Sequence, residues 1–95
     1  MLQKNRKFKD YIVDFDRSAK KDMKRLDRKV AEKVRDILKK LVAGDQSIFA
    51  EKLTAKGEQY RISFGQYRII FHEHKHIITI LVVAVRTREN AYRDV

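Results

Sequence analysis

Near the middle of the chain, hydrophobic and polar positions alternate with a period of two. Residues 59–71 read QYRISFGQYRIIF, with an apolar side chain at every second position from Tyr60 to Phe64. This is the period of a half-buried β-strand, and Gly65-Gln66 is a two-residue segment that can reverse the chain into a second strand. The pattern therefore predicts a β-hairpin with Arg61 and Arg68 on its strands, which fix the direction of an arginine stem better than a loop does.

Between Arg17 and Leu41 the apolar residues change to the three- and four-residue spacing of amphipathic helices. Asp16 is placed to cap a first short helix, and Asp27 can end that helix and cap a second one. Gly44 is a natural terminator for the second helix. The apolar stripe consists of Ala19, Met23, Leu26, Val30, Val34, Ile37 and Leu41. The pattern predicts a helical hairpin whose stripe packs into the core.

Two further stretches have strand character. In residues 11–15 (YIVDF) every second side chain is apolar, and residues 77–85 (IITILVVAV) are apolar on both faces, which is typical of a central strand. Residues 72–76 are expected to form a polar turn before this last strand. The predicted order is β-α-α-β-β-β. The predicted fold class is α+β, with two N-terminal helices packed as a hairpin on a small antiparallel sheet.

The remaining segments carry less pattern. Residues 1–9 are basic and poor in apolar side chains, so we expect a frayed arm that is either a loose tail or a source of extra phosphate contacts. Residues 44–58 are expected to form a loop that packs on the sheet through Ile48, Phe49 and Leu53. No proline, linker or internal repeat interrupts the sequence, which predicts one domain spanning the whole 95-residue chain.

The charge of the chain points to a partner. The formal net charge is +10; residues 1–42 hold 15 Lys and Arg against 7 Asp and Glu, and residues 43–95 hold 8 against 6. A compact domain with this excess attracts polyanions, so nucleic acid or an acidic protein is expected among its partners. The sequence has no cysteine, and neither a membrane span nor a secretory signal is recognisable. We therefore predict a cytoplasmic protein with no membrane partner.

Common catalytic designs are missing from the sequence. A nucleophile paired with a base, a glycine-rich phosphate loop and a carboxylate dyad are absent at recognisable spacing, and the acidic residues of the helices are placed as i,i+4 partners of Lys and Arg. His72, His74 and His76 alternate, but they lack the spacing of a known zinc site. Solvated turn histidines are the favoured interpretation, and no metal or cofactor is predicted.

Arg61, Arg68, Arg88 and Tyr92 remain as candidates for chemistry. RNA can be cleaved by attack of its own ribose 2′-hydroxyl, which needs geometry, charge stabilisation and proton transfer but no protein nucleophile. Guanidinium groups can stabilise the phosphate, and a tyrosine among cations can have its pKa lowered far enough to act as a base. Spacing alone slightly favours the alternative, in which these arginines bind surface carboxylates or backbone phosphates and the tyrosine packs at the sheet edge.

Three segments carry a family resemblance: residues 11–26 (YIVDFDRSAKKDMKRL), residues 52–71 (KLTAKGEQYRISFGQYRIIF) and residues 81–92 (LVVAVRTRENAY). They resemble the RelE/ParE superfamily of bacterial and archaeal toxins over about residues 10–93. The most specific part is the pair of Y-R-I steps followed by the ending V-x-x-R-x-x-x-Y. The resemblance implies two N-terminal helices on an antiparallel sheet, and a toxin that is neutralised by a small acidic antitoxin in a hetero-oligomeric complex.

The resemblance also implies functional residues. The RelE branch comprises ribosome-dependent endoribonucleases that cut mRNA in the A site, whereas the ParE branch inhibits DNA gyrase. Arg61 matches a basic residue of the RelE site, Arg68 the arginine that stabilises the phosphate, Arg88 the second active-site arginine and Tyr92 the C-terminal tyrosine.

The chain departs from this pattern at two places. Ser63 stands where the best-studied RelE proteins carry a lysine, and Arg86-Thr87 stands where many relatives have Gly-His or Gly-Lys. The serine removes a cation and a candidate proton donor, for which Lys52 or Lys56 are potential replacements.

Three functions are compatible with these observations. The first is a ribosome-dependent mRNA endonuclease, which the retained Arg68, Arg88 and Tyr92 favour. The second is a gyrase inhibitor without catalytic chemistry, which the departures at Ser63 and Arg86 keep open. The third is a toxin fold that survives only as a nucleic-acid-binding module. For the first function, RNA contacts are predicted at Lys20, Lys21, Lys24, Arg25, Lys52 and Lys56.

Overall fold

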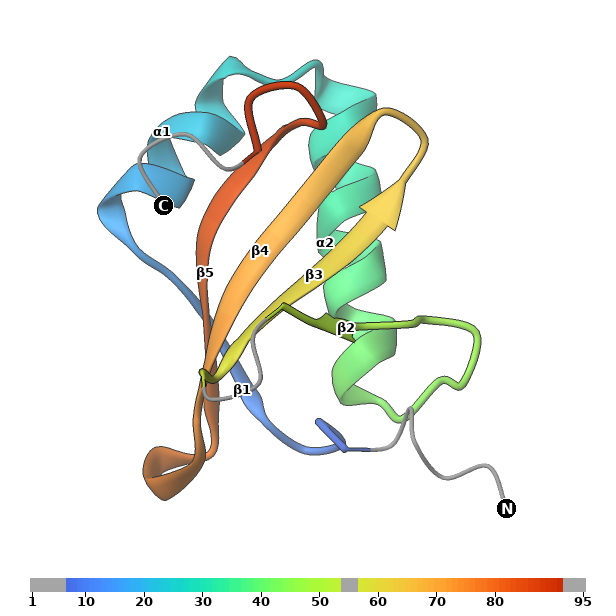
Figure 1. Ribbon diagram of the computed structural model, residues 1–95. Coiled ribbons are helices and arrows are strands. Elements are labelled where there is room, and N and C mark those ends of the chain that lie inside the picture. Colours follow the sequence, from blue (N-terminus) through green and yellow to red (C-terminus); the bar gives the residue numbers. More distant parts are fainter. Residues whose placement is uncertain (1–6, 54–56, 92–95) are drawn as a thin grey trace.

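The computed structural model describes residues 7–53 and 57–91 and folds them into two helices and a five-stranded sheet (Figure 1). Along the chain the elements are β1 (Ile12–Phe15), α1 (Arg17–Arg25), α2 (Arg28–Val42), β2 (Glu51–Lys52), β3 (Gln59–Phe64), β4 (Tyr67–His74) and β5 (Thr79–Thr87). The α+β class and the predicted order are confirmed, with β2 added inside the segment predicted to be a loop. No helix in the described ranges is long and apolar enough to cross a membrane.

The sheet has the strand order β1-β5-β4-β3-β2 and is mixed rather than purely antiparallel. The β2–β3, β3–β4 and β4–β5 pairs are antiparallel, whereas β1 pairs parallel with β5, with Ile12 opposite Thr79 and Phe15 opposite Val82. Hairpin turns fix the direction of β3, β4 and β5. β1 is separated from β5 by most of the chain, so no local turn determines its direction and the prediction of an all-antiparallel sheet is wrong for this one pair.

The main core lies between the sheet and the two helices. Buried side chains of α2, such as Val34 and Leu38, pack against Ile62 of β3 and Phe71 of β4. β5 is an inner strand that is buried on both faces, as its composition predicts. Val82 and Val85 belong to the main core, while Ala84 packs on the other face with Ile70 and Ala91.

Local signals for the helix ends are largely confirmed. The side chain of Asp16 accepts a hydrogen bond from the Ala19 N–H at 2.8 Å and so caps α1. Asp27 occupies the N-cap position of α2, but its side chain makes no capping hydrogen bond. Gly44 follows the end of α2 with a φ of +84°, the left-handed conformation that favours glycine.

Residues 7–9 do not form a frayed arm. The Phe8 ring is buried and packs edge-on against Tyr11, Tyr60 and Phe71 at centroid distances of 5.1–5.4 Å. Among several basic neighbours this one aromatic side chain anchors the segment to the core, since a buried phenylalanine contributes about 1.5–3 kcal/mol. Residues 1–6 of the expected arm lie outside the described residues.

Two other expectations need correction. β4 continues through His72 to His74, which are therefore strand residues, and a short 3-10 turn at Lys75–Ile77 makes the connection to β5. The strand continues because Glu73 between these histidines is buried and hydrogen-bonded to Tyr11. Phe49, expected to anchor the 44–58 segment, is instead 62% exposed.

Candidate functional site

The β3–β4 hairpin carries Arg61 and Arg68 on the sheet face opposite the main core. Tyr60 and Ile62 point into the core, so the residues between and after them, Arg61 and Ser63, start on the other face. Ser63 is the cross-strand partner of Arg68, which places Arg68 on that face too. Arg61 and Arg68 are thus diagonal neighbours, a relation that puts side-chain origins about 7–8 Å apart. The prediction that a hairpin holds both arginines is confirmed.

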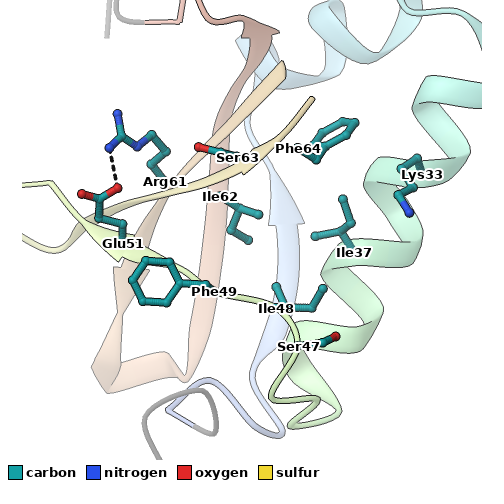
Figure 2. Close-up of a pocket in the computed structure, with 10 residues that line it drawn as sticks. All are labelled: Lys33, Ile37, Ser47, Ile48, Phe49, Glu51, Arg61, Ile62, Ser63 and Phe64. Atoms are coloured by element: carbon teal, nitrogen blue, oxygen red, sulfur yellow. Dashed lines mark hydrogen bonds and ion pairs between the residues drawn. The ribbon is translucent and has the colours of Figure 1, made fainter. Parts of the chain in front are cut away.

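Arg61 is held by an ion pair with Glu51 of β2 (Figure 2). Glu51 is the cross-strand partner of Arg61, so the short strand β2 delivers the carboxylate directly. A cavity of about 290 Å³ lies beside this pair, between β3 and α2, with Ile37 and Phe64 in its wall. The pair neutralises one of the two hairpin arginines, which the sequence did not reveal.

The turn Gly65-Gln66 is hydrogen-bonded to both Arg68 and Arg88. Gly65 has a φ of +55°, which fits the first central position of a two-residue hairpin turn. The Arg68 guanidinium donates to the carbonyl oxygens of Tyr67 at 2.8 Å and Gly65 at 3.2 Å. The Arg88 N–H donates to the carbonyl oxygen of Gln66 at 2.7 Å, and its side chain is exposed. Among the described residues no carboxylate pairs with either guanidinium.

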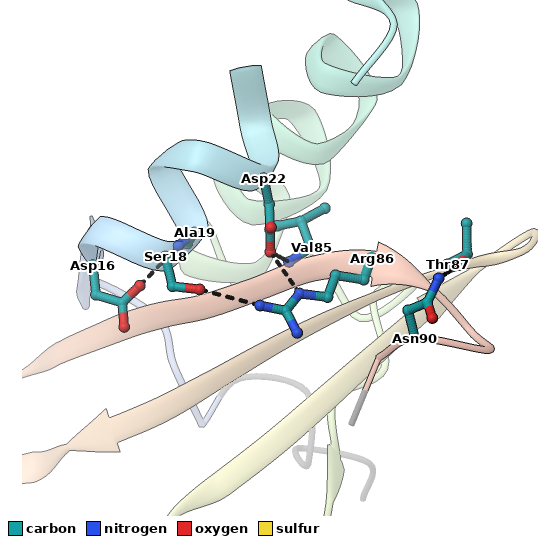
Figure 3. A network of polar contacts seen from close by, with 8 residues as sticks. All are labelled: Asp16, Ser18, Ala19, Asp22, Val85, Arg86, Thr87 and Asn90. Atoms are coloured by element: carbon teal, nitrogen blue, oxygen red, sulfur yellow. Dashed lines mark hydrogen bonds and ion pairs between the residues drawn. The ribbon is translucent and has the colours of Figure 1, made fainter. Parts of the chain in front are cut away.

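Arg86 of β5 is held from α1 (Figure 3). Asp22, which is 8% exposed, accepts hydrogen bonds from the Val85 N–H at 3.0 Å and from the Arg86 Nε at 3.1 Å. An Nη nitrogen of Arg86 donates to the Ser18 hydroxyl at 3.2 Å. The pairing of β1 with β5 reaches only to Val82. Beyond this residue Asp22, and not β1, accepts the hydrogen bond from the edge of β5. The sequence carried one signal for this contact, an acidic residue within the apolar stripe of the first helix.

A cavity of about 590 Å³ opens beside this ion pair, between the end of α1 and the ends of β4 and β5. Its lining combines two guanidinium groups, one carboxylate, an aromatic ring and small polar side chains. These residues are Asp22, Arg25, Leu26, Tyr67, Val85, Arg86, Thr87 and Asn90. Of the predicted site residues that the structure describes, only Arg25 is among them.

The basic face of α1 is open to anions. Lys20, Lys21, Lys24 and Arg25 are all exposed, and none of them forms an ion pair with any of the described residues. Together with Arg17, the three lysines line a hollow of about 370 Å³. Unpaired cations along one helix suit a phosphate backbone or an acidic protein surface.

Lys52 is not placed beside Arg61 and Arg68. Lys52 is the cross-strand partner of Tyr60, so it starts on the core side of the sheet and not on the face of Arg61 and Arg68. This position does not support Lys52 as a replacement for a lysine at Ser63. Lys56 and Tyr92 lie outside the described residues.

The pKa values of two described tyrosines are raised, which makes these side chains unsuitable as general bases. The Tyr11 hydroxyl donates to Glu73 at 2.6 Å, and this hydrogen bond, followed by desolvation, raises the pKa of Tyr11 to about 12. Burial is the main cause that raises the pKa of Tyr60, which donates to the same carboxylate at 3.4 Å. Lys7 lies 3.6 Å from Glu73 as its cationic partner. This cluster stabilises the neutral tyrosines and provides no base.

The histidines do not form a metal site. The ring of His72 lies 3.3 Å from the side-chain amide of Gln59, and His74 and His76 are exposed. Within the part of the chain that the structure describes, no group of three or more His, Cys, Asp or Glu side chains could hold a metal ion.

Comparison with known proteins identifies the family and the fold. The family model for the ParE toxin of the type II toxin–antitoxin system parDE matches residues 13–92. No curated protein sequence matches significantly.

Several solved structures share the fold. The toxin in the intact E. coli RelBE complex is 22% identical, with a TM-score of 0.68 over 81% of this chain and 95% of that chain. The Mycobacterium tuberculosis RelBE2 complex gives 18% identity and a TM-score of 0.71 over 86% and 95% of the two chains. An E. coli RelE variant with two arginines replaced by alanine, in the free state, is 27% identical, with a TM-score of 0.70 over 83% and 84%.

Proposed function

The chain belongs to the RelE/ParE superfamily of toxins of type II toxin–antitoxin systems, and we propose that it is a ribosome-dependent endoribonuclease that cleaves mRNA and inhibits translation. The observation that carries this proposal is the placement of Arg68 and Arg88 on one turn, with neither guanidinium neutralised by a described carboxylate. Cations held beside one turn can stabilise a phosphate as charge builds up in its transition state. The similarity to E. coli RelE at 26–27% identity supports the RelE-like branch.

In the proposed reaction the RNA supplies its own nucleophile. The ribose 2′-oxygen attacks the adjacent phosphorus, the bond from phosphorus to the 5′-oxygen breaks, and the products are a 2′,3′-cyclic phosphate and a 5′-hydroxyl. Tyr92 is the proposed general base for the 2′-hydroxyl proton, and the leaving 5′-oxygen takes a proton from water. Arg68 stabilises the phosphate, and Arg61 joins it when the phosphate displaces the Glu51 carboxylate from the ion pair. Arg88 stabilises charge and transfers no proton, because a guanidinium stays protonated in proteins.

The exposed cations of α1 supply the proposed binding surface for the ribosome. Lys20, Lys21, Lys24 and Arg25 stand unpaired among the described residues and face outward, which suits ribosomal RNA phosphates. The same charge supports an acidic antitoxin as the cognate partner, in line with the RelB-bound state of the solved relatives. A ribosomal target implies a cytoplasmic location.

Inhibition of DNA gyrase is the second candidate. The family model that matches the chain is that of a ParE toxin. Arg61 forms an ion pair with Glu51. Ser63 is the cross-strand partner of Arg68, so no lysine stands at this position beside Arg68. A gyrase inhibitor needs none of these groups for chemistry.

Primer extension on a defined mRNA in a bacterial translation extract tests the proposal, with ribosome-free mRNA as the parallel reaction. Cuts that appear only on translated message, at fixed positions within codons, are the expected result. The Tyr92→Phe variant should lose these cuts because it lacks the proposed base. Intact message together with failing DNA supercoiling by gyrase would overturn the nuclease and support the second candidate.

A further inference from the structure

Arg86 and the cavity beside it stand outside the four residues proposed for catalysis. We propose that this cavity is a second phosphate-binding position, which takes the RNA nucleotide next to the one cleaved, and that Asp22 positions Arg86 within it. This inference rests on the proposed function and names a further contact for the same substrate.

The strand register places Arg86 next to the candidate site. Ser63 pairs with Arg68, and Arg68 pairs with Arg86, so the three residues form one row across β3, β4 and β5. Directly opposed side chains start about 4.5–5.5 Å apart. The row lacks a cation at Ser63 and has an additional one at Arg86. The Arg86 side chain therefore starts beside Arg68 and reaches over the edge of β5 to Asp22 of α1. An RNA strand that passes around this edge can contact both arginines.

Asp22 fixes the Arg86 guanidinium instead of leaving it mobile. The carboxylate accepts from Nε, and the Ser18 hydroxyl accepts from one Nη nitrogen, so two residues of α1 hold the guanidinium. The Arg86 side chain is 19% exposed, against 9% for that of Asp22, so the guanidinium and not the carboxylate is the more accessible member of the pair. A guanidinium in a fixed orientation binds a phosphate with a smaller loss of side-chain entropy.

The rest of the cavity has the chemistry of a nucleotide site. Its volume of about 590 Å³ lies within the range of about 300–1,000 Å³ that is typical of ligand pockets. Among the described lining residues, Arg25 and Arg86 outnumber the one carboxylate, which favours an anion. The Tyr67 ring, stacked on Phe64 with centroids 5.4 Å apart, offers a surface for a base.

The edge of that base has polar partners in the same wall. The Asn90 side-chain amide donates to the Thr87 hydroxyl at 3.2 Å, and the amide carbonyl is an acceptor for a base amino group. This cavity combines charged groups with an aromatic ring and an amide. The hollow on α1 is lined by basic side chains alone among the described residues.

NMR on the ¹⁵N-labelled full chain tests this site without relying on cleavage. The probe is a 2′-deoxy hexanucleotide, which lacks the attacking hydroxyl, and the signals are the arginine Nε–Hε groups. Saturable shifts of both Arg68 and Arg86 are expected. Shifts confined to Arg68, or none for Arg86 at millimolar probe, overturn the inference. Equal shifts with inorganic phosphate alone would reduce the cavity to a simple anion site and also overturn the nucleotide assignment.

Variants separate binding from folding. Arg86→Ala should weaken hexanucleotide binding about tenfold and lower the slope of log K against log salt by about 0.7, the value for one phosphate contact on a single strand. Arg86→Lys should restore most of the slope, and Arg35→Ala, an exposed arginine on α2, should leave affinity and slope unchanged. Asp22→Asn should weaken binding with an unchanged slope, as expected for a positioning residue. If Arg86→Ala does not fold, the wild-type shifts and Arg86→Lys still decide.

The outcome is distinguishable from failure of the nuclease proposal. Ribosome-dependent cuts that persist at the wild-type rate in folded Arg86→Ala contradict this inference alone. Hexanucleotide binding through Arg86 in a protein that cuts no message contradicts the nuclease and leaves the nucleotide site standing.

Discussion

Arg68 and Arg88 are fixed on the same two-residue turn, although 20 positions separate them in the sequence. Arg68 donates from its guanidinium to the Gly65 carbonyl oxygen, and Arg88 donates from its backbone N–H to the Gln66 carbonyl oxygen. The turn therefore ties the residue after β5 to the loop between β3 and β4. This attachment fixes the Arg68 guanidinium and the backbone from which the Arg88 side chain starts, and groups fixed in advance suit electrostatic stabilisation of a transition state.

Replacement of Arg68 by alanine should therefore remove activity and leave the fold intact. We expect Arg68→Ala to lower the rate of mRNA cleavage by about 100-fold or more, the effect of losing one preorganised donor. The free energy of unfolding should change by less than about 1 kcal/mol, because the lost hydrogen bonds go to partly exposed carbonyls. Primer extension measures the first quantity and urea unfolding the second. A folded Arg68→Ala that still arrests growth, while Arg35→Ala behaves like the wild type, would sink the site assignment.

Local signals in the sequence predicted much of this fold. The hairpin around Gly65-Gln66 and the cap at Asp16 depend on residues within a few positions of each other, and the strand period of two fixed which face carries Arg61 and Arg68. These features need no knowledge of the rest of the chain. The burial of Phe8 was not predicted, because a single aromatic residue in a basic segment forms no periodic pattern.

Contacts between distant segments could not be predicted in the same way. The parallel pairing of β1 with β5 and the ion pair between Asp22 and Arg86 each join residues more than 60 positions apart. Neither contact follows from a period or a turn. The Arg61–Glu51 pair was missed for a related reason, since β2 has only two residues and carries no strand pattern.

Ile78 is a site where a substitution should stabilise the protein. It has a φ of 48° and a ψ of 51°, the left-handed conformation, which costs an ordinary L-residue about 1–2 kcal/mol. Asparagine adopts this conformation more readily, and Ile78 is 52% exposed, so little burial is lost. We expect Ile78→Asn to raise the free energy of unfolding by about 1 kcal/mol and the Tm by about 4–8 °C.

The neighbouring Ile77 provides the matched control for this substitution. It is 64% exposed but is not among the residues with positive φ. Ile77→Asn should therefore leave the Tm nearly unchanged in the same thermal scan by circular dichroism. Equal shifts for both variants would mean that lost surface hydrophobicity, and not backbone strain, determines the result.

The buried Glu73 cluster predicts a loss of stability in alkaline solution. The hydrogen bond to Glu73 raises the pKa of Tyr11 to about 12 in the folded protein, against an ordinary value of about 10 in the unfolded chain. As the pH rises above 10 the unfolded chain releases this proton first, so it binds fewer protons than the folded protein and stability falls. The contribution of Tyr11 is therefore complete below about pH 10 and is lost towards pH 12.

Comparison with Tyr11→Phe isolates this effect from the titration of lysines and of Tyr60, which occurs in both proteins. Because Tyr11 is partly exposed, we discount the full linkage for solvent screening and expect about 1 kcal/mol. The difference in unfolding free energy between wild type and Tyr11→Phe, measured with urea, should shrink by this amount from pH 9 to pH 12. Parallel stability curves over that range would contradict the prediction, because they would show that the Tyr11 proton does not stabilise the folded protein.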